Sequence, residues 1–460
     1  MKLRFVGGAS TVTGSCYYIE INELKILVEC GMHQGEGSDE RNHTAFPFRP
    51  SDIDYIFVTH AHMDHSGMLP RAAKEGFRGR VFATPATRDL LDPMLHDSAN
   101  IQQADAQWAT RKNMRAGKPP VEPLYANGDV DAALRLFDAR PYDKLFHLSN
   151  GVKFRFFDAG HILGSATLEL FFQDSKKEKK IVFSGDIGKE GNPIIKDPLT
   201  PEESDYIVME STYGNRSHKP LKESIDELVA AIKDTFSKGG NVYIPSFAVG
   251  RTQDLLYIIN NLVREGRLYR IDVYLDSPLA EKITKIYVAH PECFDEEAKR
   301  LFTANSSETA ARLHFVQTPE ESMKLNRLKG GNIIIAGSGM CEGGRIRHHL
   351  KHNLWRPECS VVFVGFQARG TLGRKIVDGE KAVSILGESV AVRASVHTIN
   401  GFSAHAGREG LIRWLEGFTN SPEVFLVHGE EEATKSLEGL IHERFGFTTH
   451  RPKDGTEVEL

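Results

Sequence analysis

Four side chains of metal-ligand type fall within six residues of this chain, and that cluster constrains the possible fold more than any other feature. The segment is His60-Ala61-His62-Met63-Asp64-His65, and it closely follows the apolar run 55–58. Such a run predicts a buried strand, so the cluster is expected in a loop at the strand's end, where a rigid scaffold displays ligands. The HxHxDH pattern arises by chance in roughly one such chain in several hundred. Imidazole and carboxylate without thiolate favour a hydrolytic zinc site with one position open for water.

Two later segments share one form, an apolar run that ends in a ligand-type residue beside glycine. They are Phe156-Phe157-Asp158-Ala159-Gly160-His161 and Ile181-Val182-Phe183-Ser184-Gly185-Asp186. Taken alone, His161 or Asp186 would more often be a hydrogen-bonded core or turn residue. With the HxHxDH cluster upstream, we interpret both as metal ligands.

Length and local pattern predict two domains. The chain has 460 residues, more than one hydrophobic core usually supports. Short β-type runs dominate the first 210 residues, whereas residues 221–263 alternate helical and strand patterns, which is typical of a parallel sheet. Because no repeat or long Pro/Ser-rich linker is present, the middle domain is expected to be inserted into the first.

The expected elements are as follows. Strands are expected at 3–6, 17–21, 25–28, 55–58, 153–157, 167–172 and 180–184, with a helix at 87–111. In the middle domain, helices 221–236 and 253–263 flank a buried strand at 241–244. After residue 390, strands 391–399 and 424–427 are expected, with one helix at 408–416.

Three further motifs give the pattern a family resemblance. They are Glu210-Ser211-Thr212-Tyr213-Gly214, Gly401-Phe402-Ser403-Ala404-His405 and Val427-His428-Gly429-Glu430. HxHxDH, His161 and Asp186 resemble the metallo-β-lactamase superfamily, and these motifs resemble those of its β-CASP nucleases, especially bacterial and archaeal relatives of the pre-mRNA cleavage endonuclease subunit. The resemblance implies an αββα sandwich over 1–205 and 391–460, with a parallel-sheet β-CASP domain inserted at 206–390.

The resemblance also implies a role for each residue. One zinc is expected on His60, His62 and His161, a second on Asp64, His65 and His428, and Asp186 between them. Such a pair activates water and neutralises charge on the phosphate. The expected catalytic residues besides the metals are Asp64, His405 as the proton donor to the leaving oxygen, and Glu210, which orients His405.

Two positions depart from the family pattern. The aspartate usual in its first motif is Glu29 here, and the aspartate usual after Ser-Ala-His-Ala is Gly407. A carboxylate at the first position is expected to hydrogen-bond a ligand histidine, and such partners affect metal affinity or activity by about 10–100-fold. Glu29 keeps the charge but is one methylene longer, so the placement of that histidine is open, as is what replaces the lost carboxylate at Gly407.

Three glycine-containing loops of the middle domain are candidates for binding RNA. One follows the strand at 241–244, and the others contain Gly337-Ser338-Gly339 and Gly370-Thr371-Leu372-Gly373-Arg374. Free amides at a helix start can hold a phosphate, although such loops are also common as plain tight turns. The resemblance implies that these loops line the channel that binds RNA, and the expected contacts are Arg251, Ser338, Thr371 and Arg374.

Composition limits the partners and the compartment. A net charge of −5 is unusual for a nucleic-acid binder, but two zinc ions add positive charge where the phosphate must sit. Five scattered cysteines without CxxC spacing argue against disulfides and a thiolate site, and no apolar run is long enough for a membrane helix or signal peptide. We expect a cytoplasmic enzyme that acts on single-stranded RNA, and a homodimer is an open possibility.

Other functions compete with a ribonuclease. A DNA nuclease is the nearest rival, but DNA-repair members of the β-CASP group carry valine where this chain has His428. A non-catalytic RNA-binding subunit would have lost ligands, and every ligand position here is filled. A hydrolase of thioesters or lactones has no use for the insertion. Ribonuclease J is a weaker match because only about 30 residues follow His428, too few for that enzyme's extra C-terminal domain. The N-terminal KH domain of archaeal relatives is not expected, since the first strand begins by Leu3.

Overall fold

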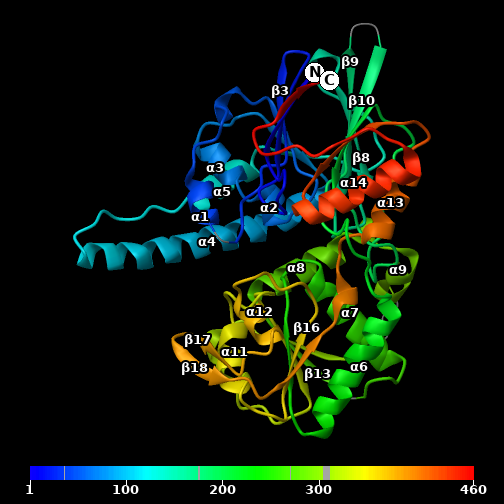
Figure 1. The fold of residues 1–460 in the computed structure, drawn as a ribbon. Helices are drawn as coiled ribbons and strands as arrows, with labels where there is room; N and C mark the ends of the chain where they lie inside the picture. Colours follow the sequence, from blue (N-terminus) through cyan, green and yellow to red (C-terminus); the bar gives the residue numbers. More distant parts are fainter. Residues whose placement is uncertain (36, 175–176, 270, 304–310) are drawn as a thin grey trace. The chain divides into compact units, whose positions relative to one another are not determined.

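The fold consists of two compact units, and the second interrupts the first in sequence. The computed structural model describes residues 1–35, 37–174, 177–269, 271–303 and 311–460 (Figure 1). One unit is Met1–Ser217 with His405–Leu460, and the other is His218–Ala404. The chain passes from the first unit to the second after Ser217 and returns after Ala404, and both positions lie later than the expected domain boundaries at 206 and 390. The reason is strand pairing: Tyr206–Glu210 pairs within the first unit, and Ser395–Thr398 pairs within the second.

The first unit is built on two seven-stranded sheets, ordered β22-β1-β2-β3-β4-β5-β6 and β21-β20-β11-β10-β9-β8-β7. The first sheet contains β1 (Lys2–Gly7), β2 (Cys16–Ile21), β3 (Leu24–Val28), β4 (Tyr55–Phe57), β5 (Arg80–Ala83), β6 (Phe137–Ala139) and β22 (Glu457–Glu459). The second contains β7 (Phe146–His147), β8 (Lys153–Asp158), β9 (Ala166–Asp174), β10 (Lys177–Phe183), β11 (Tyr206–Glu210), β20 (Glu423–Val427) and β21 (Thr449–His450).

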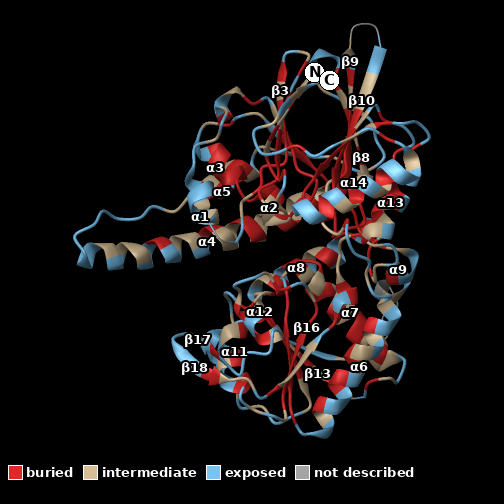
Figure 2. Cartoon of the chain, in the orientation of Figure 1, coloured by how far each residue is buried: buried red, intermediate tan, exposed pale blue. Residues whose placement is uncertain are grey.

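Alternating side chains explain how these sheets pack. In β1, Leu3 and Phe5 are fully buried and belong to a core that also takes residues from the second sheet, such as Phe156. In β11, Val208 joins this same core, whereas Ile207 packs in a second core with residues of two helices. The second sheet is therefore covered on both faces, with the buried residues gathered along its strands (Figure 2).

Seven helices accompany these sheets among the described residues. They are α1 (Ser38–His43), α2 (Met63–Ser66), α3 (Leu69–Lys74), α4 (Pro85–Arg115), α5 (Asn127–Leu134), α13 (Arg408–Glu416) and α14 (Glu431–Phe445). The expectation for the C-terminal part was incomplete, because α14 was not foreseen. Leu437 and Ile441 of α14 pack in the core behind the second sheet. The expected strand 391–399 was wrong as a single element, since β18 ends at Ala391 and a separate strand begins at Ser395.

Helix α4 is the longest described helix, with 31 residues and a length of about 46 Å. It begins after Thr84, whose hydroxyl accepts a hydrogen bond from the Thr87 amide at 3.2 Å and so caps the helix. Its first half buries Leu90, Leu91 and Leu95, but its outer half projects from the rest of the first unit (Figure 1). The helix extends beyond the expected end at residue 111.

The second unit contains a six-stranded sheet ordered β14-β13-β15-β12-β16-β19, in which the neighbouring strands pair in parallel. Its strands are β12 (Val242–Pro245), β13 (Asp272–Asp276), β14 (Arg312–Phe315), β15 (Asn332–Ala336), β16 (Ser360–Phe363) and β19 (Ser395–Thr398), and an antiparallel ribbon pairs β17 (Ala382–Ile385) with β18 (Glu388–Ala391). Its helices are α6 (Leu221–Ser237), α7 (Arg251–Arg264), α8 (Pro278–Ala289), α9 (Glu296–Thr303), α10 (Pro319–Leu325), α11 (Ile346–Asn353) and α12 (Leu372–Val377). Ile244 and Tyr243 belong to separate cores, so the sheet is buried on both faces, as parallel sheets usually are.

Two further sequence expectations can be compared with the fold. All five cysteines are free thiols in buried positions, as expected for a chain without a disulfide framework. Across the described ranges, every helix is too short or too polar to cross a bilayer.

Candidate metal centre

The HxHxDH segment forms the loop after β4 and the short helix α2, and backbone contacts hold it in place. The amide of Ser15 donates to the carbonyl of Asp64 at 2.8 Å, and the amide of Cys30 donates to the carbonyl of His65 at 2.8 Å. A side chain at Gly31 would place its Cβ 1.8 Å from the Asp64 oxygen, so only glycine permits this approach. The loop is thus fixed by the segments that adjoin β2 and β3.

The first ligand-type group consists of His60, His62, His161 and Asp186, each of which offers one atom within 4.8 Å of the others. Nδ1 of His62 lies 3.1 Å from Nε2 of His60 and 3.2 Å from Nε2 of His161. Oδ2 of Asp186 lies 3.4 Å from His60 Nε2 and 3.5 Å from His161 Nε2. The structure therefore brings together residues from three separate loops of the first unit.

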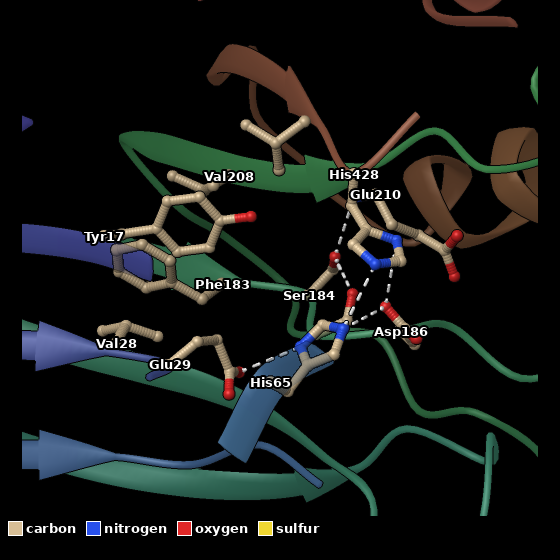
Figure 3. A pocket seen from close by; sticks show the side chains of 12 residues that line it. Tyr17, Val28, Glu29, His65, Phe183, Ser184, Asp186, Val208, Glu210 and His428 are labelled. Carbon is tan, nitrogen blue, oxygen red and sulfur yellow. Dashed lines mark hydrogen bonds and ion pairs between the residues drawn. The ribbon is translucent and has the colours of Figure 1, made fainter. Parts of the chain in front are cut away.

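The second group consists of Asp64, His65 and His428. Nε2 of His428 lies 3.5 Å from Oδ2 of Asp64 and 3.3 Å from Nε2 of His65. Oδ1 of Asp186 lies 3.3 Å from His65 Nε2 and 3.5 Å from His428 Nδ1. Asp186 thus directs one oxygen toward each group, and Figure 3 shows it beside His65 and His428.

The chemistry of these donors fits divalent cations. Burial lowers the pKa of His60 to about 3 and that of His62 to about 4, so both imidazoles keep the lone pair that a metal needs. Burial alone would raise the pKa of Asp186, but the surrounding histidines hold it well below its usual range. Oδ1 of Asp186 and Nδ1 of His161 are buried and accept or donate no hydrogen bond within the described part of the chain. A carboxylate oxygen so placed is costly unless a cation or a proton satisfies it.

His405 and Glu210 meet beside the first group. Nδ1 of His405 lies 3.4 Å from each carboxylate oxygen of Glu210 and 3.8 Å from Oδ2 of Asp186. Glu210 is buried at the end of β11 and also accepts the Ile187 amide at 2.5 Å. Burial by itself would lower the pKa of His405, but the carboxylates of Glu210 and Asp186 outweigh it and raise the pKa to about 9. The two carboxylates therefore favour the protonated form of His405.

The structure answers the open question about Glu29. Its backbone has a positive φ of 66°, and its buried carboxylate accepts the Thr59 amide at 3.2 Å and lies 3.7 Å from Nδ1 of His65. The longer side chain thus places its carboxylate beside a ligand-type histidine, but the expected hydrogen bond is not formed, and Nδ1 of His65 has no hydrogen-bond partner among the described residues. At the second departure from the family pattern, Gly407 directly precedes α13 and provides no side-chain cap for this helix.

Two threonines contact ligand-type histidines and were not singled out in the sequence. Oγ1 of Thr59 lies 3.0 Å from Nδ1 of His60, and Oγ1 of Thr212 lies 3.1 Å from Nδ1 of His428. Such contacts fix the orientation of the ring. Thr59 directly precedes the HxHxDH segment and Thr212 lies within the motif 210–214, and this position in the sequence was the signal that could have identified them.

The RNA-binding candidates belong to the second unit, where the three loops follow β12, β15 and β16. Thr371 caps α12 by accepting the Arg374 amide at 3.2 Å, and Nε of Arg374 lies 2.9 Å from Asp378. Arg251 begins α7 with Nη1 3.6 Å from Asp254, and the Ser338 hydroxyl accepts the Gly343 amide at 3.1 Å. All four candidates therefore have partners within the unit.

These loops contact one another at the carboxyl edge of the parallel sheet. The side chain of Gln367 donates to the Gly339 carbonyl at 3.0 Å, and the Gly373 amide donates to the Met340 carbonyl at 3.2 Å. Phe247 and Phe366, in the loops after β12 and β16, are 48% and 46% exposed. This edge is where parallel sheets usually bind ligands, and the two phenylalanines were missed in the sequence because nothing marks them as exposed.

Models of three protein families match consecutive parts of the chain. The metallo-beta-lactamase superfamily matches residues 10–234, the Beta-Casp domain matches 252–376, and the Zn-dependent metallo-hydrolase RNA specificity domain matches 389–452.

Whole-chain relatives agree with these matches. Ribonuclease TTHA0252 of Thermus thermophilus is 39% identical over 442 residues, 96% of each chain. Transcription termination factor FttA of Methanosarcina mazei is 30% identical over 98% of this chain and 70% of its own length. An RNase J-like protein of Methanocaldococcus jannaschii is 28% identical over 100% of this chain and 99% of its own. A solved protein of unknown function from Enterococcus faecalis has a similar fold, with a TM-score of 0.59, 11% identity, and coverage of 100% and 99%.

Proposed function

Because this chain belongs to the β-CASP nucleases of the metallo-β-lactamase superfamily, and so to the metal-dependent hydrolases, we propose that it is a zinc-dependent ribonuclease that hydrolyses RNA phosphodiester bonds. The observation that carries the proposal is the position of Asp186, whose two oxygens face two separate groups of ligand-type residues. A carboxylate with this geometry suits a bridge between two cations. The preferred mode is endonucleolytic, with 5′-to-3′ exonucleolytic cutting as a further activity of the same site.

Seven side chains are proposed to hold the metals. His60, His62 and His161 would hold one zinc, Asp64, His65 and His428 would hold the other, and Asp186 would be shared. Bound in this way, two zinc ions neutralise charge on the phosphate and bring the pKa of water toward neutrality. Glu29 lies 3.7 Å from His65 Nδ1, on the side of the ring away from the Nε2 that faces Asp186, and so orients this ligand.

His405 is proposed to protonate the leaving 3′ oxygen. It lies beside the first ligand group but belongs to neither group, and its pKa is raised to about 9. As water adds to phosphorus and releases a proton to solvent, the P–O3′ bond breaks, the proton on His405 passes to that oxygen, and the neutral imidazole then takes up a proton from water. Glu210, 3.4 Å from Nδ1, holds the ring in one orientation and keeps it protonated.

The substrate is proposed to be single-stranded RNA. The Thermus thermophilus relative is named a ribonuclease, and the model matched at residues 389–452 describes an RNA specificity domain. Arg251, Ser338, Thr371 and Arg374 lie in loops at the carboxyl edge of the second unit's sheet, where exposed Phe247 adds a surface for base stacking.

The test is cleavage of matched oligonucleotides. The purified chain, supplied with zinc, is incubated with RNA and DNA of the same sequence, each labelled at the 5′ end, and the products are mapped with and without chelator. RNA cleavage that chelator abolishes and zinc restores is expected, and substrates with a blocked 5′ end separate internal cutting from exonucleolytic cutting. Equal cleavage of DNA would favour a DNA nuclease, and tight binding of RNA without cleavage would favour a non-catalytic subunit.

A further inference from the structure

The outer half of α4 carries an exposed basic and aromatic surface that the metal centre does not use. We call Trp108, Arg111, Lys112 and Arg115 the α4 basic face. Trp108 is 67% exposed, and all three cationic side chains are exposed. The residues recur at i, i+3, i+4 and i+7, so they share one side of the helix. Nζ of Lys112 lies 5.7 Å from the centre of the Trp108 ring, which confirms that they are neighbours.

The opposite side of the helix is occupied. Oγ1 of Thr110 accepts the Val121 amide at 2.9 Å, and Nδ2 of Asn113 donates to the Pro119 carbonyl at 2.9 Å. Thr110 lies roughly 200° around the helix from Trp108. The returning segment 116–124 therefore packs away from the α4 basic face and leaves it open to solvent.

The charge of this region is opposite to that of the whole chain. The chain carries a net charge of −5, yet residues 105–122 contain four cations, Arg111, Lys112, Arg115 and Lys118, against two carboxylates, Asp105 and Glu122. A local excess of this kind attracts a polyanion. A second copy of the chain is a poor fit, because a symmetric contact through this face would bring its cations against the same cations of the other copy.

We propose that the α4 basic face binds a stretch of the single-stranded RNA substrate at a distance from the cleaved bond. This inference rests on the proposed ribonuclease function and adds a second contact to it. The arginines and the lysine pair with phosphates, and one base stacks on Trp108.

The distance between the two sites is set by the helix itself. At the start of α4, the hydroxyls of Thr84 and Thr87 donate to the Gly164 carbonyl at 2.6 and 2.8 Å, in the loop that carries His161. Trp108 lies 23 residues beyond Pro85, or about 35 Å along the helix. A strand of only a few nucleotides at the metal centre therefore cannot reach the face, whereas a longer strand can.

The experiment compares RNA of about 5 and about 40 nucleotides, near the lower end of the usual site sizes for single strands and well above them. The test variant is Arg111→Gln/Lys112→Gln/Arg115→Gln, in which glutamine preserves helix propensity. The matched control removes three exposed lysines elsewhere on the first unit: Lys144→Gln/Lys435→Gln/Lys453→Gln. KM and kcat are measured for both lengths, and Kd for the longer RNA is measured by fluorescence anisotropy at several salt concentrations in the His405→Ala background.

For the test variant, KM for the longer RNA should rise about tenfold with kcat unchanged, and the short RNA should be unaffected. The slope of log Kd against log salt should fall by about 2, since each lost phosphate contact on a single strand removes about 0.7. Trp108→Ala should weaken binding by about fivefold or more without changing this slope. The control triple variant should behave as the parent protein does.

A test variant that matches the control in both Kd and slope would overturn the inference. So would a Trp108→Ala variant that binds RNA normally but converts a dimer to a monomer in analytical ultracentrifugation, because the face would then be a protein interface. A parent protein that cleaves neither RNA refutes the proposed ribonuclease function instead, and the anisotropy slopes still decide the role of the face.

Discussion

Replacing His405 with alanine should stop proton transfer while leaving the metals in place. The imidazole belongs to neither ligand group, and its nearest approach to Asp186 is 3.8 Å. A positioned general acid contributes about 10²–10⁴-fold to kcat, equivalent to roughly 2.7–5.4 kcal/mol of activation free energy. The Glu210 and Asp186 carboxylates raise the pKa of His405 and so favour the protonated form that a general acid needs.

The assay measures zinc content and single-turnover cleavage of His405→Ala beside the parent protein. RNA is one substrate, and a phosphodiester with a leaving group of low pKa is the other, because a good leaving group needs no proton. The expected result is unchanged zinc content, a large rate loss on RNA, and a much smaller loss on the activated substrate. Loss of zinc, or an equal rate loss on both substrates, would refute the assignment of His405 as proton donor.

Glu210→Gln provides an independent check of the same pair. The glutamine keeps the size and the hydrogen bond from Ile187, but it removes the carboxylate that raises the pKa of His405. Because the donor is active only when protonated, activity is lost as pH rises through its pKa. The alkaline limb of the kcat profile should therefore move to lower pH in Glu210→Gln, and an unmoved limb would show that Glu210 does not act through His405.

Metal analysis should find close to two zinc ions per chain. His428→Ala should lower the zinc content toward one, because the second ligand group would then retain only Asp64, His65 and the shared Asp186. A parent protein that holds only one zinc when metal-replete would contradict the proposed bridging role of Asp186. Glu29→Asp should weaken metal binding by about 10–100-fold in competition with a chelator, since the shorter side chain withdraws from His65, which is already 3.7 Å away, and an unchanged affinity would show that this carboxylate orients nothing. Single-stranded RNA should be cut faster than duplex of the same sequence in a gel assay, because stacking on exposed aromatic side chains needs unpaired bases, and equal rates would argue against it.

Local patterns predicted the elements well, and distant pairing is where they failed. The HxHxDH cluster is confined to one loop after one strand, so spacing alone predicted it. Helix 408–416 agrees with α13 at both ends, since its apolar residues recur at helical spacing before Gly417. By contrast, residues 391–399 looked like one strand, although β18 and β19 lie in different sheets. Period-two alternation carries no information about the partner strand.

In the candidate site too, residues close together in the sequence were predicted from the sequence pattern, whereas contacts between distant residues were not. That His428 meets His65 across 363 residues came from the family resemblance and not from spacing. How Glu29 reaches His65 was left open, because the answer depends on a backbone φ of 66° at that residue. The exposure of Trp108 also escaped the sequence, since a helical period alone does not tell how far a helix projects from its core.

The pairing of β11 with β20 sets the order in which the centre is assembled during synthesis. These adjacent strands are joined in parallel register, Val208 opposite Phe425, although the whole second unit lies between them in the chain. At about 5–20 residues per second, roughly 10–50 s pass between the synthesis of Asp186 and that of His428. During that interval the nascent chain holds one complete ligand group, whereas the second group lacks His428, and His405 is also missing for most of the time. Strand β20, which leads directly into His428, therefore completes the metal centre.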